Sequence, residues 1–341
     1  MSRPCWIFTA LSLVAGFACR TPEPAAPLTR CEYSRPQMGV EFRIVLYAPD
    51  QARGDTAAAA AFARVAELNA LLSDYEDASE VTRLSKSAGS GQAMPAGPDL
   101  WLVLDRAQRL AARTEGAFDV TVRPLVQVWR RARRQREMPS LEKLAAAREA
   151  TGYRHLELDP RRRTARLLVP GMSLDLGGIA KGYAADEAMK VLRKHRINRA
   201  LVAVAGDMVA GDPPPGKTGW RIEVPSLDAQ SAPASQHVTL ADAALSTSGD
   251  FFQRLELGGK RYSHIIDPRS GRPITDHSLV TVIAPDGITA DSLATAISVL
   301  GPDAGLELIR RSPGVQARIH RQPAEKIEIL QSDGFGRWLE P

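Results

Sequence analysis

Apolar residues recur along the chain with both helical and strand periods. Residues 55–72 carry Phe62 and Val65 on one face at helical spacing. Asp55 stands at the expected N-cap of that helix. Residues 41–48 alternate and are rich in β-branched and aromatic side chains, which is typical of a strand. The same criteria predict further helices at 98–113, 140–150, 179–196, 290–300 and 303–311, and further strands at 156–158, 165–169, 200–205, 220–224 and 279–283.

The order of these elements favours an α+β architecture. Strands and helices are interspersed, and the short neighbouring strands 156–158 and 165–169 suggest a hairpin. Loops rich in Pro, Gly, Ser and Ala at 213–216 and 229–236 interrupt the second half. A uniform doubly wound parallel sheet is therefore the less favoured arrangement.

The first 18 residues have the pattern of a secretion signal. Arg3 precedes an apolar run from Trp6 to Ala18, which is too short for a permanent membrane span but suits the hydrophobic region of a signal. We therefore expect residues 1–18 to be a signal peptide and the protein to be exported.

Cys19 follows this run directly. Residues 15–19 resemble the end of a bacterial lipoprotein signal, although Gly16 stands where leucine is usual. A lipidated Cys19 followed by a flexible, Pro-containing tether at 19–35 would hold a domain at 36–330 near a membrane on the periplasmic side. The alternatives are cleavage near Ala18 with a free Cys19, and a Cys19–Cys31 disulfide.

Composition and charge argue against a disordered chain and against a nucleic-acid partner. Hydrophobic residues make up 44% and charged residues 24%, which is ordinary for a folded protein. Lys and Arg total 44 against 39 Asp and Glu, and a net charge of +5 is too small to imply nucleic acid. The densest basic run, 130–136, lacks interleaved aromatic residues for base stacking. It is predicted to be a solvated helix or loop face.

Residues 173–186 carry the most distinctive candidate chemistry. Gly177 and Gly178 let the backbone approach a ligand closely, the following helix start offers N–H groups to an anion, and Lys181 adds a positive charge. The segment matches neither a Walker A loop nor a dinucleotide fingerprint. It suits a phosphorylated ligand, and tight packing of a strand against a helix would explain it as well.

Asp291 and Thr295 are a second candidate site. They lie four residues apart at the start of a predicted helix, so their oxygens fall on one face. A carboxylate with a hydroxyl is hard-oxygen ligation that suits Mg²⁺. The alternative is that Asp291 caps the helix and Thr295 packs in the core.

A series of short blocks, taken in order, resembles the FAD:protein FMN transferase family, the ApbE-type flavin transferases. The resemblance runs from about Met38 to about Ile319. The blocks are 38–39, 72–75, 116–125, 173–186, 245–250, 262–273 and 291–295. One departure is Ala205-Gly206-Asp207, where the family often has Gly-Gly-Asp.

The resemblance implies a flavin-transferase fold with mixed sheets and flanking helices, in two lobes around a central site for FAD and magnesium. It implies Asp291, Thr295 and a main-chain oxygen of Gly178 as ligands of Mg²⁺, which would offset repulsion between the FAD diphosphate and nearby carboxylates. Tyr75 and Phe118 could flank a flat ring, although core packing explains each aromatic alone as well. The implied lining of the FAD site is Met38, Tyr75, Ala117, Phe118, Asp119, Asp175, Lys181, His264 and Ile265.

The implied activity is transfer of FMN from FAD to a Thr or Ser hydroxyl of an acceptor protein, with release of AMP. The expected acceptors carry a Ser/Thr-Gly-Ala-Thr-like motif and include membrane electron-transfer subunits. His264 is the best candidate for deprotonating the hydroxyl, because the pKa of histidine can lie near neutrality, and it could equally only orient the ligand. The alternatives are an FAD pyrophosphatase that yields FMN and AMP, and a non-catalytic flavin-binding lipoprotein.

Overall fold

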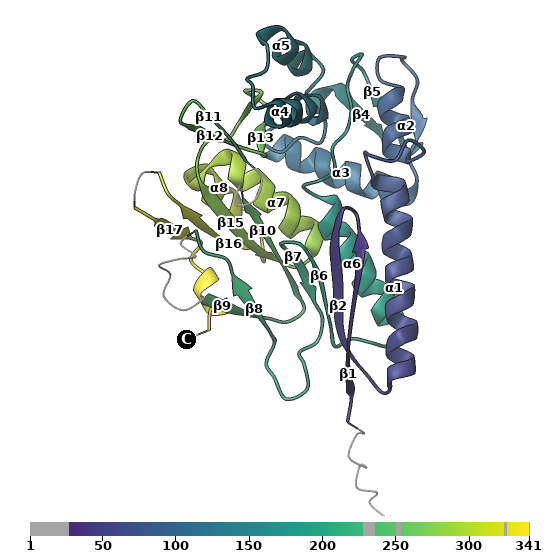
Figure 1. Cartoon of the computed structure of the whole chain (residues 1–341). Coiled ribbons are helices and arrows are strands. Elements are labelled where there is room, and N and C mark those ends of the chain that lie inside the picture. Colours follow the sequence, from purple (N-terminus) through teal and green to yellow (C-terminus); the bar gives the residue numbers. More distant parts are fainter. Residues whose placement is uncertain (1–26, 228–235, 250–253, 324–325, 341) are drawn as a thin grey trace, which may run out of the picture.

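An antiparallel sheet of eight strands forms the centre of the molecule (Figure 1). The computed structural model describes residues 27–227, 236–249, 254–323 and 326–340. In spatial order the strands are β1 (Thr29–Gln37), β2 (Val40–Ala48), β6 (Ala200–Val204), β7 (Asp207–Ala210), β10 (Ala243–Gly249), β15 (Ser278–Ala284), β16 (Gln316–Arg321) and β17 (Glu328–Gln331). We expected mixed sheets, but the described ladders are all antiparallel, and parallel pairing occurs there only at the isolated bridge Val122–Ser173.

Helices cover one face of this sheet and build the main core with it. They are α1 (Gln51–Leu72), α6 (Ala180–Lys194), α7 (Gly287–Leu300) and α8 (Pro302–Arg310), and α3 (Pro98–Arg113) joins the same core. Phe42, Phe62 and Leu104 are among its fully buried side chains. Burying each of them removes apolar surface from water, which stabilises the packing of helices on sheet.

The opposite face of the sheet packs against a hairpin. Strands β8 (Trp220–Val224) and β9 (Gln236–Leu240) and the 3₁₀ helix η2 (Phe335–Trp338) form a second core with Leu245 and Ile283. Phe335 is fully buried there. The folded unit therefore extends beyond the expected limit at residue 330.

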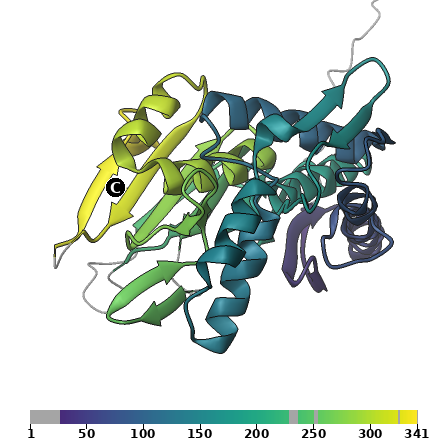
Figure 2. The same cartoon turned by 90° about the horizontal axis from the view of Figure 1, so that it is seen from above.

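A third group of elements lies at one end of the sheet. Helices α4 (Arg123–Gln135) and α5 (Leu141–Glu149) lie beside the hairpin of β11 (Arg254–Leu257) and β12 (Lys260–Ser263), as Figures 1 and 2 show. Trp129 of α4 stacks on Tyr262, with ring centroids 5.7 Å apart, and donates from Nε1 to Gly271 O at 2.9 Å. The remaining elements are α2 (Glu80–Lys86), η1 (Tyr153–His155), β13 (Ile266–Asp267) paired with β14 (Arg272–Pro273), and the small sheet of β3 (Met94–Pro95), β5 (Thr164–Leu167) and β4 (Leu156–Asp159).

Most predicted helices are present, with one cap assigned wrongly. The helix predicted at 98–113 is α3, and the basic run lies on and just after α4. Helix α1 begins earlier than predicted because Asp50, not Asp55, is its N-cap and accepts from Arg53 N at 2.8 Å. Asp55 instead accepts a hydrogen bond from the Tyr33 hydroxyl at 2.8 Å.

The predicted tether at 19–35 is wrong in its second half. Residues Thr29–Gln37 form β1 and pair with β2 at all nine positions, so the folded part begins before residue 36. Cys31 of this strand carries a free, buried thiol. The predicted signal peptide and Cys19 lie outside the described residues.

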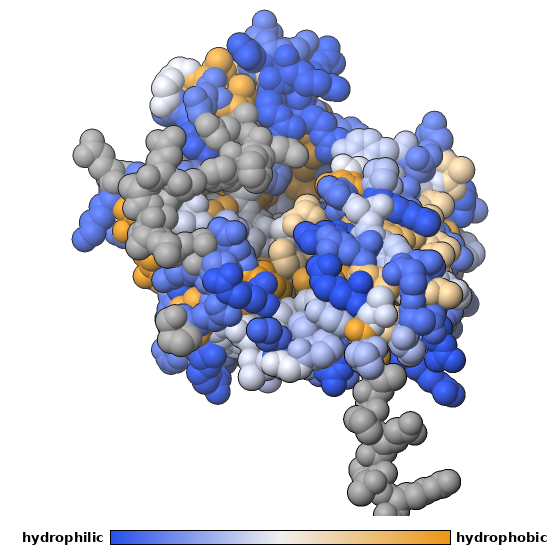
Figure 3. Space-filling view, turned by 60° about the horizontal axis from the view of Figure 1, so that its bottom comes forward, coloured by the Kyte–Doolittle hydropathy of each residue, from blue (hydrophilic) through white to orange (hydrophobic). Residues whose placement is uncertain are grey.

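The face in Figure 3 is mostly hydrophilic, with hydrophobic side chains in small separate areas. Within the described ranges, every helix is too short or too polar to cross a bilayer.

Candidate functional site

The structure brings nearly all of the predicted site residues to one pocket of about 370 Å³. The members of the predicted set that line it are Ala117, Phe118, Asp119, Asp175, Gly178, Lys181, His264, Ile265, Asp291 and Thr295. These residues come from segments far apart in the sequence, so the fold and not a local motif assembles the pocket.

Met38 and Tyr75 are not among the residues that line the pocket. Met38 lies in the turn between β1 and β2, where its φ is 50°, and packs against the main core. The Tyr75 ring is 74% exposed, and the Arg130 guanidinium lies 5.3 Å from its centroid. The structure therefore leaves a flavin-facing role for these two residues untested.

A close crossing of α6 and α7 places the two halves of the predicted metal site together. A Cβ atom on Gly182 would lie 2.1 Å from Gly287 O, so no larger residue fits at this contact. The crossing brings Asp291 Oδ2 to 3.0 Å from Gly182 N, which donates to it. Asp291 is not a helix cap, because Asp286 is the N-cap of α7.

Two buried carboxylates and one ammonium group meet at this crossing. Lys181 Nζ lies 2.9 Å from Asp207 Oδ2 and 3.5 Å from Asp291 Oδ2. Burial and the negative charge of Asp207 raise the pKa of Asp291 well above its usual range. Burial lowers the pKa of Lys181, but the attraction of Asp207 and Asp291 outweighs burial and raises it. The cluster thus carries one more negative than positive charge when all three groups are ionised.

Asp207 was missing from the predicted site. Its signal was the Ala205-Gly206-Asp207 sequence at the end of a predicted strand. Ala205 and Gly206 form the two-residue turn between β6 and β7, and Asp207 is the first residue of β7. Ala205 adopts a φ of 49°, a left-handed conformation that glycine adopts without strain. A backbone preference, more than crowding by a methyl group, therefore favours glycine at position 205.

Several backbone N–H groups of the glycine turn, which were predicted to face an anion, already donate hydrogen bonds to protein oxygens. Gly177 N donates to Asp175 Oδ1 at 2.8 Å, and Ala180 N donates to Leu176 O at 2.8 Å. With Gly182 N bound to Asp291, the start of α6 does not offer all its N–H groups to an anion. The positive charge of Lys181 lies between carboxylates and does not stand alone in the pocket.

The donor set of this cluster fits a hard divalent cation. Asp207 and Asp291 offer carboxylate oxygens, and Thr295 offers a hydroxyl. This hydroxyl lies close to Gly178, because a Cβ atom added to Gly178 would be only 2.8 Å from Thr295 Oγ1. Mg²⁺ prefers such oxygens. A cation would also balance the excess negative charge of the cluster. Among the described residues, no group of three or more Asp, Glu, His or Cys side chains forms a metal site, so backbone, hydroxyl or substrate oxygens would complete the coordination.

Residues 117–120 form another part of the pocket wall. Phe118 is buried in the main core and also lines the pocket. Asp119 accepts from Thr121 N at 2.8 Å and from Thr121 Oγ1 at 2.7 Å. Burial raises the pKa of Asp119 despite these hydrogen bonds. The wall is therefore a rigid surface with a partly desolvated carboxylate.

His264 is exposed on the segment between β12 and β13. Its neighbours are fixed by the main chain, because Ser263 N donates to Ile274 O and Ile274 N to Ile265 O, both at 3.0 Å. The side chain of Asp267 pairs with Arg269 at 2.9 Å. His264 therefore stands at the edge of the pocket on a well-supported backbone, which suits either a base or an orienting group.

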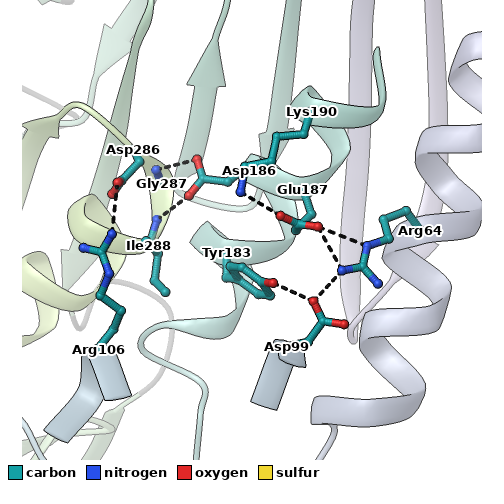
Figure 4. Close-up of polar contacts among 10 residues, drawn as sticks. All are labelled: Arg64, Asp99, Arg106, Tyr183, Asp186, Glu187, Lys190, Asp286, Gly287 and Ile288. Carbon is teal, nitrogen blue, oxygen red and sulfur yellow. Dashed lines mark hydrogen bonds and ion pairs between the residues drawn. The ribbon is translucent and has the colours of Figure 1, made fainter. Parts of the chain in front are cut away.

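Polar contacts among α1, α3, α6 and α7 hold the helices that carry the site (Figure 4). Asp186 of α6 accepts from Gly287 N at 2.7 Å and from Ile288 N at 2.9 Å, so it supplies carboxylate oxygens to the start of α7. Burial raises the pKa of Asp186 to about 6. In a separate group of contacts, Arg64 of α1 joins Asp99 of α3 to Glu187 of α6.

Comparisons with known proteins agree in sequence and in structure. A family model described as the ApbE family matches residues 38–319. The FAD:protein FMN transferase of Klebsiella pneumoniae (strain 342) is 31% identical over 93% of this chain and 90% of the relative, and that of Vibrio cholerae is 33% identical over 88% and 89%. The solved flavin transferase ApbE from Vibrio cholerae superposes with a TM-score of 0.81 at 30% identity, covering 92% of this chain and all of that one. The apo flavinyl transferase ApbE of Pseudomonas stutzeri gives a TM-score of 0.81 at 30% identity, over 93% and 98%.

Proposed function

Because the chain belongs to the ApbE family, we propose that it is an FAD:protein FMN transferase that acts with Mg²⁺. The hydroxyl oxygen of a Thr or Ser on an acceptor protein attacks the FMN phosphorus of FAD. The bond from that phosphorus to the bridging oxygen breaks, AMP leaves, and FMN remains on the acceptor through a phosphoester. The flavin is substrate, and no redox step is needed.

The observation that carries this proposal is the cluster of Asp207, Asp291 and Lys181 at one wall of the pocket. Phosphoryl-type transfer depends mostly on positioning and on balancing negative charge. A pocket that combines buried carboxylates, a lysine and a glycine turn offers both. Asp291, Thr295 and the main chain at Gly178 would hold Mg²⁺, with Asp207 close to them. Bound there, Mg²⁺ would draw charge from the phosphate oxygens and stabilise the leaving group.

The other groups bind and orient the reactants. Phe118 and Ile265 provide apolar surface for the flavin. The Asp119 carboxyl can accept a hydrogen bond from the polar edge of the flavin ring, or donate one to it when protonated. His264 stands where an acceptor segment enters, so it takes the proton of the attacking hydroxyl or holds that hydroxyl in line. Both roles of His264 remain part of the proposal.

We also propose that the enzyme is exported and anchored by a lipidated Cys19 on the periplasmic side of a membrane. The signal-like sequence of residues 1–18 supports this. Acceptors with a Ser/Thr-Gly-Ala-Thr-like motif on membrane electron-transfer subunits would then share a surface with the enzyme. An anchor would raise the local concentration of enzyme near such acceptors.

The test incubates the purified protein with FAD, Mg²⁺ and a peptide that carries this motif, followed by mass spectrometry of the peptide and assay of AMP. The expected result is a peptide that gains the mass of FMN while AMP appears in equal amount. Release of AMP and free FMN without a modified peptide would establish the pyrophosphatase alternative instead. Tight FAD retention with no AMP under any metal condition would establish a flavin-binding lipoprotein.

A further inference from the structure

Helix α4 carries a group of arginines that have no carboxylate partner within the described structure. Among the residues that the structure describes, Arg130, Arg131, Arg133 and Arg134 form no ion pair. Many arginines elsewhere, Arg64 and Arg123 among them, do pair with Asp or Glu. Solvated arginines on a helix face are common. A binding role for any of these four therefore depends on where each side chain lies relative to the pocket.

Two of the four line the catalytic pocket. Arg130 and Arg133 are half-buried and belong to its wall, together with His264, whereas Arg134 is exposed and does not. Burial and then the positive charge of Arg130 lower the pKa of Arg133. Two like charges are thus held close together at the pocket, where an anion between them would relieve their repulsion.

The position of this pair relative to His264 is fixed. Trp129, the residue before Arg130, stacks on Tyr262 and donates to Gly271 O at 2.9 Å. Residues 262–271 are the segment that carries His264. The Arg130 guanidinium lies over the Tyr75 ring, 5.3 Å from its centroid, and this cation–π contact helps to hold it in place. Burial and the negative charge of Asp175 raise the pKa of Asp74 against the opposing positive charges of Arg123 and Arg130, and Asp74 makes no ion pair with Arg130 within the described structure.

We infer that Arg130 and Arg133 bind acidic side chains of the acceptor protein close to the hydroxyl that is modified. This rests on the proposed function. The anionic group of FAD is its diphosphate, and Lys181 and the cation site already serve a diphosphate. The arginines are therefore available to another anion. Because they line the same pocket as His264, a segment that delivers a hydroxyl to His264 can also reach them. A membrane surface fits less well, because half-buried side chains in a pocket wall cannot lie flat against a bilayer.

The test measures binding without catalysis. A fluorescein-labelled peptide carries the Ser/Thr-Gly-Ala-Thr-like core with the modified residue replaced by Ala, flanked by Asp in one version and by Asn in the other. Fluorescence anisotropy gives the affinity of each peptide for the full chain loaded with FAD and Mg²⁺. The variants are the double substitution R130Q/R133Q, the charge-preserving R130K/R133K, and R134Q as the control on the same helix.

We expect the Asp peptide to bind the unmodified protein about tenfold more tightly than the Asn peptide at low ionic strength, and this preference should shrink as salt is added. R130Q/R133Q should remove the preference, R130K/R133K should keep most of it, and R134Q should leave it unchanged. Equal binding of both peptides by the unmodified protein, or a preference that survives R130Q/R133Q, would overturn the inference.

Two further measurements separate other roles of the arginines. A loss of FAD affinity in R130Q/R133Q equal to the loss of peptide affinity would assign the pair to FAD. Loss of binding to phosphatidylglycerol vesicles with an intact peptide preference would assign it to lipid. If the Asp peptide is preferred but its hydroxyl-bearing form gains no FMN mass, the proposed function fails and the binding surface stands.

Discussion

Thr295 contributes one hydroxyl to the site, and its chemistry can be separated from its packing. Thr295→Val keeps the shape and removes the oxygen, whereas Thr295→Ser keeps the oxygen. We expect Thr295→Val and Asp291→Asn to lower FMN transfer about 10²- to 10³-fold, because charge stabilisation by a metal is worth several kcal/mol. FAD affinity should change by less than about tenfold, since most of the FAD surface lies elsewhere.

Steady-state transfer assays and FAD titrations check this, with Thr295→Ser as the control that should retain most activity. The apparent Mg²⁺ requirement should also rise as the pH is lowered, because burial and Asp207 raise the pKa of Asp291 and a proton then competes with the metal. Full activity of Thr295→Val at every Mg²⁺ concentration would show that the ion is bound by other oxygens.

At the scale of elements, the register of α6 against α7 determines the site. In addition to the N-cap Asp286, Asp186 of α6 accepts two hydrogen bonds from the first turn of α7, so Asp186→Ala leaves two buried N–H groups without their acceptor. We expect this change to lower the free energy of unfolding by about 1–3 kcal/mol and to weaken Mg²⁺ binding, because Asp291 lies one turn beyond the capped end.

Urea denaturation and Mg²⁺ titration of the same preparations test the effect. Asp186→Asn keeps one acceptor and should lose less stability than Asp186→Ala. The matched control is Asp303→Ala, which removes an exposed carboxylate from the first turn of α8. Equal effects of the substitutions at 186 and 303 would mean that the cap does not hold the two helices in register.

Local patterns predicted helices well and distant partners poorly. Helix α3 was predicted at its observed limits, because an amphipathic period and flanking signals belong to one segment. Asp207 belongs to the site because the fold places β7 beside Lys181, and the spacing of these two residues along the chain does not predict that contact. The Pro-containing stretch after Cys19 predicts a tether that extends into strand β1. The residues of β1 are mostly exposed, so its own pattern does not predict a strand, and pairing with β2 stabilises it. The pocket residues were found through ordered motifs, which local periodicity alone would not have grouped.

For the whole molecule, a buried histidine on the far side of the sheet should make stability depend on pH. His320 of β16 is buried, and its Nε2 accepts from Arg318 Nε at 2.8 Å. Burial, followed by the positive charge of Arg318, lowers the pKa of His320 to about 4. In the unfolded chain histidine titrates near its ordinary value of about 6.5, so between about pH 6.5 and 4 the unfolded state binds more protons than the native state.

The free energy of unfolding should therefore fall as the pH drops through this window, by at most about 1.4 kcal/mol per pH unit from this residue. His320→Gln keeps an acceptor for Arg318 and cannot titrate, so its unfolding free energy should fall less steeply with decreasing pH. Contributions of other groups, such as Asp186, cancel in the difference between the two proteins. Denaturation curves across pH 7 to 4 measure that difference, and His155→Gln, at an exposed position, serves as control. Parallel curves for the unmodified protein and His320→Gln would show that His320 becomes protonated in the native state without cost, and that Arg318 tolerates a second buried positive charge beside it.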